Sequence, residues 1–265
     1  MTQQQDAALV AAGGVRLEVA DGVAVVTLDR PPVNALNRAM RAAIVATFDA
    51  LSERPDVRCV VLSAAGRVFC AGSDLKDRPD AHTEGDFLAH NRITRETTNA
   101  IRECAKPVIA AVNGAALGAG LGLVAACDIL YACEEASFAM PEIDVGLAGG
   151  AAMLKTLLGR STLRRMMMTG DRLSAQDMLR RNVLEDVVLA AELMPVALAM
   201  ARKIAAKAPL AVAYAKRSAN MVDVMPQRDA YRFEQEFTMA LSRTEDAREA
   251  RQAFLEKRPP QFQGR

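Results

Sequence analysis

The chain has 265 residues, 51% of them hydrophobic, so it can bury a sizeable core in one large domain or in a main domain with an appendage. Lys and Arg number 33 against 32 Asp and Glu, and the formal net charge of +1 gives no electrostatic reason to expect a nucleic acid or an anionic membrane as partner. Residues 1–14 lack the pattern of a secretion signal, and no apolar segment reaches the ~20 residues that span a bilayer. We therefore expect a cytoplasmic globular protein.

The cysteines and histidines form no recognisable metal or redox motif. The five cysteines are odd in number and make no Cys-x-x-Cys pair: they are Cys59, Cys70, Cys104, Cys127 and Cys133. None lies at metal-finger spacing from His82 or His90, so we expect reduced thiols in the core and no metal site. Neither histidine lies beside a nucleophile, which leaves a Ser-His-Asp or Cys-His hydrolase without support.

Strand and helix patterns alternate along the first part of the chain. Residues 15–31 predict a β-hairpin with Asp21-Gly22 at its turn, and residues 37–56 predict a helix that ends near Pro55. The next expected elements are a buried strand at 57–65, an amphipathic helix at 87–104, a buried strand at 106–114, a helix from about residue 120, a strand at 128–133 and a short strand at 136–140. This alternation indicates a layered α/β domain.

Strand patterns disappear after about residue 195. Consecutive helices are expected at 195–209, 210–222, 228–242 and 244–259, separated by proline or polar breaks. We therefore divide the chain into an α/β core over 1–195 and a helical C-terminal region over 196–265. The polar segment 76–86, which contains glycine and proline, is typical of a mobile loop.

The segment 113–130, NGAALGAGLGLVAACDIL, places four glycines and five alanines where a buried strand leads into a helix. Two phosphate-binding motifs fail here. A G-x-G-x-x-G motif starting at Gly118 meets Leu123 instead of its third glycine, and the Walker pattern fails at LLGRST, where Arg160 replaces the lysine. Two uses remain open: close packing of a helix on a strand, or a turn whose N–H points at a ligand oxygen as half of an oxyanion hole.

A second segment, VLSAAGRVFCAGSDLK at 61–76, also leaves a buried strand and turns at Gly72. With both turns in view, the chain resembles the enoyl-CoA hydratase/isomerase, or crotonase, family. The resemblance rests on LDRPPVNAL, GRVFCAGSDLK, KPVIAAVNGAALGAGLGLVAACDILYA, ASFAMPEIDVGL, GDRLSAQDM and TEDAREARQAFLEKRPPQF, in family order over nearly the whole chain.

This resemblance implies a fold and a set of partners. The fold is α/β, a crotonase-like spiral of repeated ββα units with a C-terminal helical trimerisation region. The substrate is an acyl-coenzyme A thioester, no further cofactor is needed, and the chain assembles as a homotrimer or as a homohexamer of paired trimers. The implied oxyanion hole uses the backbone N–H groups of Ser73 and Ala119, where the family usually has glycine at the second position.

The family's proton-transferring glutamate matches Glu142 in MPEIDVGL. Apolar neighbours there, among them Ile143 and Val145, would raise the pKa of its carboxyl group by desolvation, whereas from the sequence alone an exposed surface glutamate is the ordinary expectation. For Asp74 and Asp144 we favour structural roles.

The second glutamate of two-glutamate hydratases is absent, because its position is Gly122. A single carboxylate can shuttle a proton between two carbons, which suits double-bond isomerisation, or can support hydration if another group orients the water. We expect a hydratase that acts on a 2-enoyl-CoA, with isomerisation as the alternative. A hydrolase, a decarboxylase or a non-catalytic acyl-CoA binder is less favoured.

The resemblance also implies a coenzyme A site. Its implied members are Val33, Ala35, Leu36, Ala71, Gly72, Lys76 and Gly118, together with Phe254 and Lys257 from a neighbouring subunit's tail. The competing interpretation of Lys76 and Lys257 is that of ordinary solvated charges. The acyl pocket is expected to include part of residues 77–95, and its length is not predicted.

Overall fold

A seven-stranded sheet lies at the centre of the computed structural model, which describes residues 9–11, 13–79 and 84–265. The order is β1-β2-β3-β4-β5-β7-β10; the first two pairings are antiparallel and the remaining four are parallel. The strands are β1 (Leu9–Ala11), β2 (Val15–Ala20), β3 (Val23–Leu28), β4 (Cys59–Ala64), β5 (Val108–Val112), β7 (Ile129–Cys133) and β10 (Asp186–Val188).

The predicted hairpin and the buried strands are confirmed. β2 and β3 pair around Asp21 and Gly22, whose φ angles of 52° and 78° are those of a tight two-residue hairpin turn. Every residue of β4 and β5 is buried, as expected for parallel strands covered on both faces. Their continuous apolar sequences therefore reflect their central place in the sheet.

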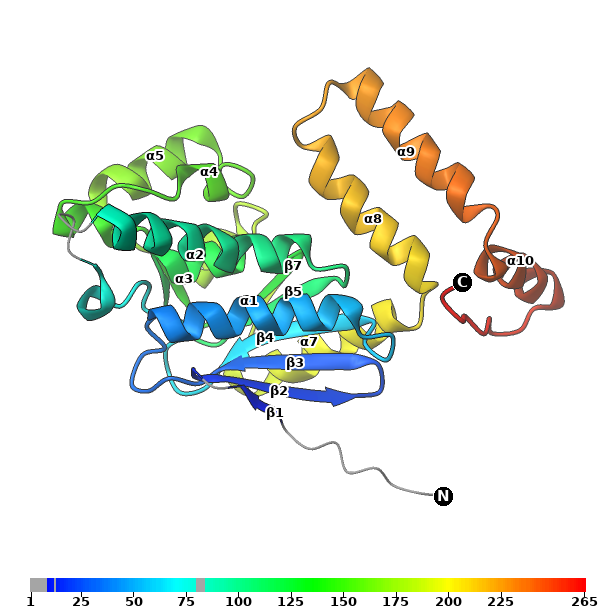
Figure 1. Cartoon of the computed structure of the whole chain (residues 1–265), viewed down its shortest axis with the longest axis horizontal. Coiled ribbons are helices and arrows are strands. Elements are labelled where there is room, and N and C mark those ends of the chain that lie inside the picture. Colours follow the sequence, from blue (N-terminus) through cyan, green and yellow to red (C-terminus); the bar gives the residue numbers. More distant parts are fainter. Residues whose placement is uncertain (1–8, 12, 80–83) are drawn as a thin grey trace.

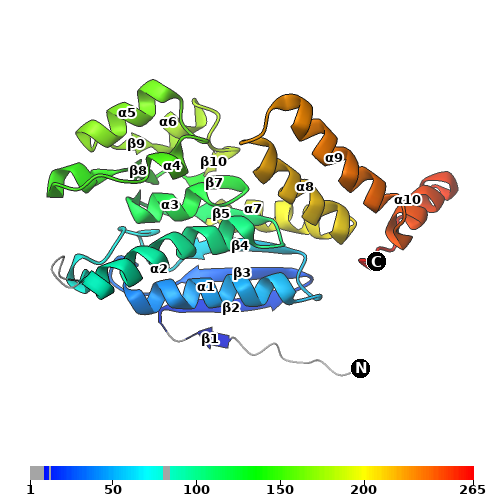
Figure 2. The ribbon, with the colours of Figure 1, turned by 45° about the horizontal axis from the view of Figure 1, so that its top comes forward.

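Helices cover the sheet on both faces (Figures 1 and 2). On one face lie α1 (Arg38–Glu53) and α2 (Glu84–Glu103), which pack against each other, and on the other lies α7 (Ala190–Ala205). α1 begins where the side chain of Asn37 accepts a hydrogen bond from the N–H of Met40, and it buries Ile44 and Phe48 at helical spacing.

A second, three-stranded sheet lies beside the first, in the order β6-β8-β9. It consists of β6 (Ala116–Leu117), β8 (Ser137–Ala139) and β9 (Leu173–Ser174). The short helices of this region are α3 (Ala119–Ala125), α4 (Ala151–Leu154), α5 (Arg160–Thr169) and α6 (Ala175–Leu179), with 3₁₀ segments η1 (Leu75–Asp77) and η2 (Pro141–Val145).

The helix expected from Pro195 begins earlier, at Ala190. Pro195 lies inside α7, where its ring removes one backbone hydrogen bond, but Leu193, Ala197 and Ala201 are buried, and α7 packs against the central strands. Burial of this face therefore outweighs the proline. The division that we drew at residue 195 falls inside this helix, and the two-part description of the chain stays a prediction.

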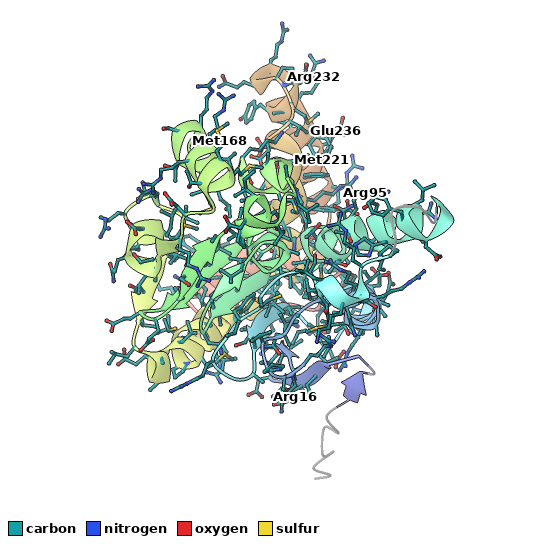
Figure 3. All side chains as sticks on the ribbon, turned by 90° about the vertical axis from the view of Figure 1, so that its left-hand side faces the viewer. Arg16, Arg95, Met168, Met221, Arg232 and Glu236 are labelled. Atoms are coloured by element: carbon teal, nitrogen blue, oxygen red, sulfur yellow. The ribbon has the colours of Figure 1, made fainter. Side chains whose placement is uncertain are left out.

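The last helices form an arm that extends from the body (Figures 1 and 2). α8 (Pro209–Val222) and α9 (Gln227–Leu241) lie side by side, and α10 (Glu245–Glu256) follows near the C-terminus. The buried Lys216 joins α8 to the body, with its Nζ 2.9 Å from Oδ2 of Asp128 and hydrogen bonds to two backbone carbonyls. Figure 3 shows Arg232 and Glu236 on the arm and Met168 on α5 of the body.

All five cysteines are free and buried, which confirms the expectation of core thiols. Burial raises the pKa of the Cys70 thiol to about 11, so it is protonated and unreactive at neutral pH. Within the described ranges, no helix is both long enough and apolar enough to cross a bilayer. His82 and residues 80–83 of the polar loop lie outside the described residues.

Candidate active site

A cavity of about 430 Å³ brings together most of the residues expected around a thioester. Its walls come from the turn that follows Cys70, the start of α2, the residue before α3, and η2 with the segment after it. Among the predicted site residues, those that line it are Ala71, Gly72, Ser73, Gly118 and Glu142.

A larger cavity of about 550 Å³ lies between the body and α8. Its lining includes Lys216 and Asp128, which already form an ion pair, and none of the predicted site residues. Size alone does not identify a site, and the convergence of polar groups favours the smaller cavity.

The turn at Gly72 directs the N–H of Ser73 away from the neighbouring segment. The N–H of Leu36 donates to the Gly72 carbonyl at 2.8 Å, and the N–H of Asp74 donates to the Leu36 carbonyl at 3.0 Å. Alternation along the chain then places the Ser73 N–H on the opposite side, where it finds no acceptor in the described part of the chain. Gly72 has φ +96°, and a Cβ there would lie 2.9 Å from the Leu117 carbonyl oxygen, so glycine is required.

The second free N–H belongs to Ala119, the first residue of α3. Helix geometry leaves it without an intrahelical partner, and no other described group accepts from it. The two turns touch, because a Cβ built on Gly72 would lie 3.6 Å from the Ala119 nitrogen. Two unpaired N–H groups on adjoining turns are what an oxyanion hole requires.

Glu142 lies directly against the second turn. A Cβ on Gly118 would collide with Oε1 of Glu142, so the glycine, at φ +52°, makes room for the carboxyl group. Oε2 of Glu142 is buried and has no hydrogen-bond partner in the structure. Desolvation raises the pKa of this carboxyl, as predicted from the sequence.

The source of that desolvation differs from the one expected. Ile143 and Val145 are exposed, so they do not bury their neighbour, and only Met140 of the flanking apolar residues is in the core. The carboxyl is instead enclosed by the backbone of the α3 turn at Gly118. This contact joins residues that are distant in sequence, so the local pattern could not show it.

The two aspartates beside the site behave differently. Asp74 caps η1 by accepting from the Lys76 N–H and pairs with Arg30 at 2.8 Å, and these two interactions lower the pKa of its carboxyl. Its predicted structural role is confirmed. Asp144 lines the cavity, is exposed and lies beside Gly170, and its structural role stays a prediction.

The position of the absent second glutamate is occupied by a sulfur side chain. A Cβ on Gly122 would lie 3.1 Å from Cε and 3.3 Å from Sδ of Met153, with Thr98 next to it. Any side chain at position 122 would therefore have to displace the end of Met153. No second carboxylate reaches the site from α3.

The remaining wall of the cavity comes largely from α2, within the segment 77–95 expected to contribute to the acyl pocket, although no individual residue of that segment was predicted as a site residue. The lining residues are Phe87, His90, Asn91 and Thr94, with Arg78 beside Phe87. Counted from Phe87, their spacing of three, four and seven residues places them on one face of the helix. The three polar side chains on that face could have indicated from the sequence that it lines a site. The hydroxyl of Thr94 is buried and unpartnered. Burial lowers the pKa of His90, which favours its neutral form.

The predicted coenzyme A residues that do not line the cavity fall into three groups. Leu36 is buried and supports Ser73 through a backbone bridge, while the carbonyls of Val33 and Ala35 accept hydrogen bonds from the Ala71 N–H and from Arg30. Lys76 is exposed on η1, next to the cavity-lining Leu75.

Phe254 and Lys257 form the third group. They are exposed on α10, at the far end of the arm from α2 and α3 (Figure 1). A single chain does not bring them to the cavity, and their contribution from a neighbouring subunit stays a prediction. Across the described residues, no cluster of three or more His, Cys, Asp or Glu is arranged to hold a metal ion.

Comparison with known proteins identifies the family. The profile described as "Enoyl-CoA hydratase/isomerase" matches residues 18–265. The chain belongs to this family. It is a crotonase-superfamily enzyme that processes acyl-CoA thioesters, and the predicted spiral of ββα units followed by C-terminal helices is confirmed.

Characterised relatives have different reactions. The chain is 36% identical over 236 residues to the (7aS)-7a-methyl-1,5-dioxo-2,3,5,6,7,7a-hexahydro-1H-indene-carboxyl-CoA hydrolase of Mycobacterium tuberculosis, covering 89% of this chain and 96% of the relative. It is also 36% identical over 254 residues to the carnitinyl-CoA dehydratase of Salmonella enteritidis, covering 91% and 94%.

The structural match is equally extensive. An enoyl-CoA hydratase from Mycobacterium smegmatis superposes with a TM-score of 0.88 at 35% identity, covering 94% of this chain and 98% of that one. Family membership thus defines the fold and the thioester chemistry, and these differently named relatives leave more than one reaction open.

Proposed function

We propose that this enzyme adds water reversibly to the double bond of a 2-enoyl-CoA, with Glu142 as its single acid and base. The observation that carries the proposal is the position of the Glu142 carboxyl, buried and unpartnered on one side, against the turn whose N–H groups can hold a thioester oxygen. A proton carrier beside an oxyanion hole is suited to reactions that pass through a thioester enolate.

In the proposed mechanism the thioester oxygen accepts hydrogen bonds from the Ser73 and Ala119 N–H groups. Ionised Glu142 takes a proton from water as the water oxygen bonds to C3 and the C2–C3 π electrons move toward the thioester oxygen. The two N–H groups stabilise the resulting enolate. Protonated Glu142 then gives its proton to C2, which completes addition of one water molecule and returns the carboxylate.

The raised pKa of Glu142 supports both steps. The ionised carboxylate becomes a stronger base toward water, and the protonated carboxyl has a pKa closer to neutral pH, which suits it to give the proton to C2. Since Met153 lies where a second glutamate would project, the proposal assigns both steps to the Glu142 carboxyl group. The polar face of α2, with His90, Asn91 and Thr94, is available to orient the water.

A second candidate is hydrolysis of an acyl-CoA, which the hydrolase among the 36%-identical relatives favours. The same oxyanion hole would serve it. Because both reactions consume water, the products must distinguish them.

The test is incubation of the purified enzyme with crotonyl-CoA, 3-hexenoyl-CoA and a branched or aromatic enoyl-CoA in deuterated water, followed by product mass analysis. Hydration predicts a thioester that has gained one D₂O, with one deuterium retained on C2. Release of free coenzyme A would indicate hydrolysis, and an isomer without added water would indicate bond migration; either result as the main product would contradict the proposed hydratase. Glu142→Gln is the matched control.

We further propose that the thioester is the only organic group the reaction needs and that the enzyme acts in the cytoplasm as a homotrimer or homohexamer. The arm supports this assembly, because it leaves Tyr231, Met239 and Phe254 exposed in a single chain. In such an assembly Phe254 and Lys257 would meet the nucleotide end of coenzyme A in a neighbouring subunit.

A further inference from the structure

A buried arginine lies behind the Ser73 turn. Arg41 of α1 is 1% exposed, and its Nη2 donates to the Ser73 hydroxyl at 2.7 Å. Its Nε has no hydrogen-bond partner, and among the described residues no carboxylate lies within ion-pair distance of its guanidinium group. The one polar atom that this cation contacts therefore belongs to a residue of the oxyanion hole.

Such a cation is costly to bury. Desolvation lowers the pKa of Arg41, and an arginine nonetheless keeps its charge in a protein. The flanking buried positions of α1, Met40 and Ile44, are apolar, so an apolar side chain would satisfy packing here at lower cost. The charge of Asp77 acts on Arg41 through space and offsets part of this cost, yet among the described residues no carboxylate pairs directly with the guanidinium group, so retention of the cation points to a use for its electric field.

The field of Arg41 reaches the cavity. His90 lines the opposite wall on α2, and after burial the charge of Arg41 is the next largest cause that lowers the pKa of His90. Arg41 is almost completely buried, so water screens its guanidinium group little. A negative charge that develops at the Ser73 N–H would form within this field.

We propose that Arg41 is a positioning residue of the oxyanion hole: through the Ser73 hydroxyl it fixes the Ser73 N–H and places a positive charge behind the developing enolate oxygen. This inference rests on the oxyanion hole of the proposed function and is independent of which product forms. Ser73 then contributes twice, with its N–H toward the substrate and its hydroxyl as the acceptor that holds Arg41.

The test is the infrared carbonyl band of butyryl-CoA labelled with ¹³C at the thioester carbon, a saturated thioester that is neither hydrated nor isomerised. Binding to the wild type should move the band to lower wavenumber because the hole polarises the carbonyl. Arg41→Met should lose about half of that shift or more, whereas Arg41→Lys should retain most of it. The control Arg232→Met removes an exposed charge from α9 of the arm and should keep the full shift.

Ser73→Ala provides a second variant, which keeps the backbone N–H of Ser73 and removes only the hydroxyl that accepts from Arg41. It should lose part of the band shift and lower kcat by about 10-fold with KM nearly unchanged, as expected when only the transition state loses support. Circular dichroism and thermal melting verify that each variant is folded.

The outcomes separate the two claims. A wild-type complex without a band shift would remove the oxyanion hole and the proposed function together. A full shift in folded Arg41→Met or in Ser73→Ala, or equal losses in Arg41→Met and Arg41→Lys, would overturn the role of Arg41 and leave the proposed function standing.

Discussion

At the scale of single residues, the site depends on two glycines that make room for other groups. Gly72 adopts a positive φ and lets its turn approach the Leu117 carbonyl, and Gly118 leaves space for the Glu142 carboxyl. Burial of the Glu142 carboxyl costs folding free energy, because the group is desolvated and its Oε2 has no hydrogen-bond partner among the described residues. The desolvation that suits Glu142 to proton transfer should therefore lower the stability of the folded protein.

This cost predicts a pH-dependent effect of Glu142→Gln on stability. The pKa of Glu142 is higher in the folded than in the unfolded protein, so the folded state binds this proton more tightly. The free energy of unfolding therefore falls as the pH rises from the unfolded-state pKa through the folded-state pKa. Glutamine does not ionise. The variant should melt at a higher temperature than wild type at about pH 7, and the difference should vanish at about pH 3.

Thermal melts across this pH range provide the measurement. Glu134→Gln, at an exposed glutamate, is the matched control and should melt like wild type throughout. A Glu142→Gln protein less stable than wild type at neutral pH would contradict the account.

The Glu142 carboxyl, which we propose is catalytic, and both turns were predictable because each lies in a local motif. The residues that surround the carboxyl and the turns in the folded protein were not predictable. Arg41 looks like one more polar residue of an amphipathic helix, and only the fold shows that it contacts Ser73. The enclosure of Glu142 by Gly118 is likewise a contact between segments distant in sequence.

At the scale of elements, periodicity predicted the long helices and the buried strands within a few residues of their ends. β6, β9 and β10 contain two or three residues each, too few for any alternation to be read. The start of α7 was wrong by five residues, because tertiary burial of Leu193 overrides the preference of proline for a helix start. The packing of α3 against Met153 of α4 also had no local signal.

That packing predicts how a second carboxylate could be restored. Gly122→Glu alone should crowd the thioether of Met153 and lower the melting temperature, whereas Gly122→Glu combined with Met153→Ala should give the new side chain room. If water activation limits hydration, the double variant should raise the ratio of hydrated to isomerised product, measured by mass analysis. An unchanged ratio in a folded double variant would contradict the idea that water activation limits hydration.

At the scale of the whole molecule, the sequence predicted consecutive C-terminal helices but not that they leave the body as an arm. α7 stays on the sheet, and Lys216 attaches α8, the first helix of the arm, to the body; beyond Lys216 few arm residues are buried. The apolar side chains exposed there are Met221, Val224, Tyr231, Met239, Phe254 and Leu255. This exposure is consistent with a surface that another subunit covers.

Phe254 tests whether the tail completes a neighbour's site. Its side chain is 83% exposed, so Phe254→Ala should leave the melting of an isolated chain unchanged, but in an assembly it should weaken coenzyme A binding by about 10-fold and reduce the oligomer. Deleting the tail from Ala253 would be less specific, because it also removes backbone donors to the buried Asp246.

Light scattering and coenzyme A titration measure both effects, with Met168→Ala on α5 as the control at an exposed apolar residue of the body. A full-size oligomer with undiminished coenzyme A affinity would show that Phe254 is neither a nucleotide contact nor an interface residue.

The central claim is that the Glu142 carboxyl transfers the proton beside a thioester held by the Ser73 and Ala119 N–H groups. The most direct measurement compares turnover and acyl-CoA binding of wild type and Glu142→Gln on the substrate that the wild type converts. Turnover should fall by roughly 10²–10⁴ with binding nearly unchanged, because glutamine keeps the shape of the side chain and loses the proton transfer. Turnover near that of wild type in a folded Glu142→Gln enzyme would contradict the account.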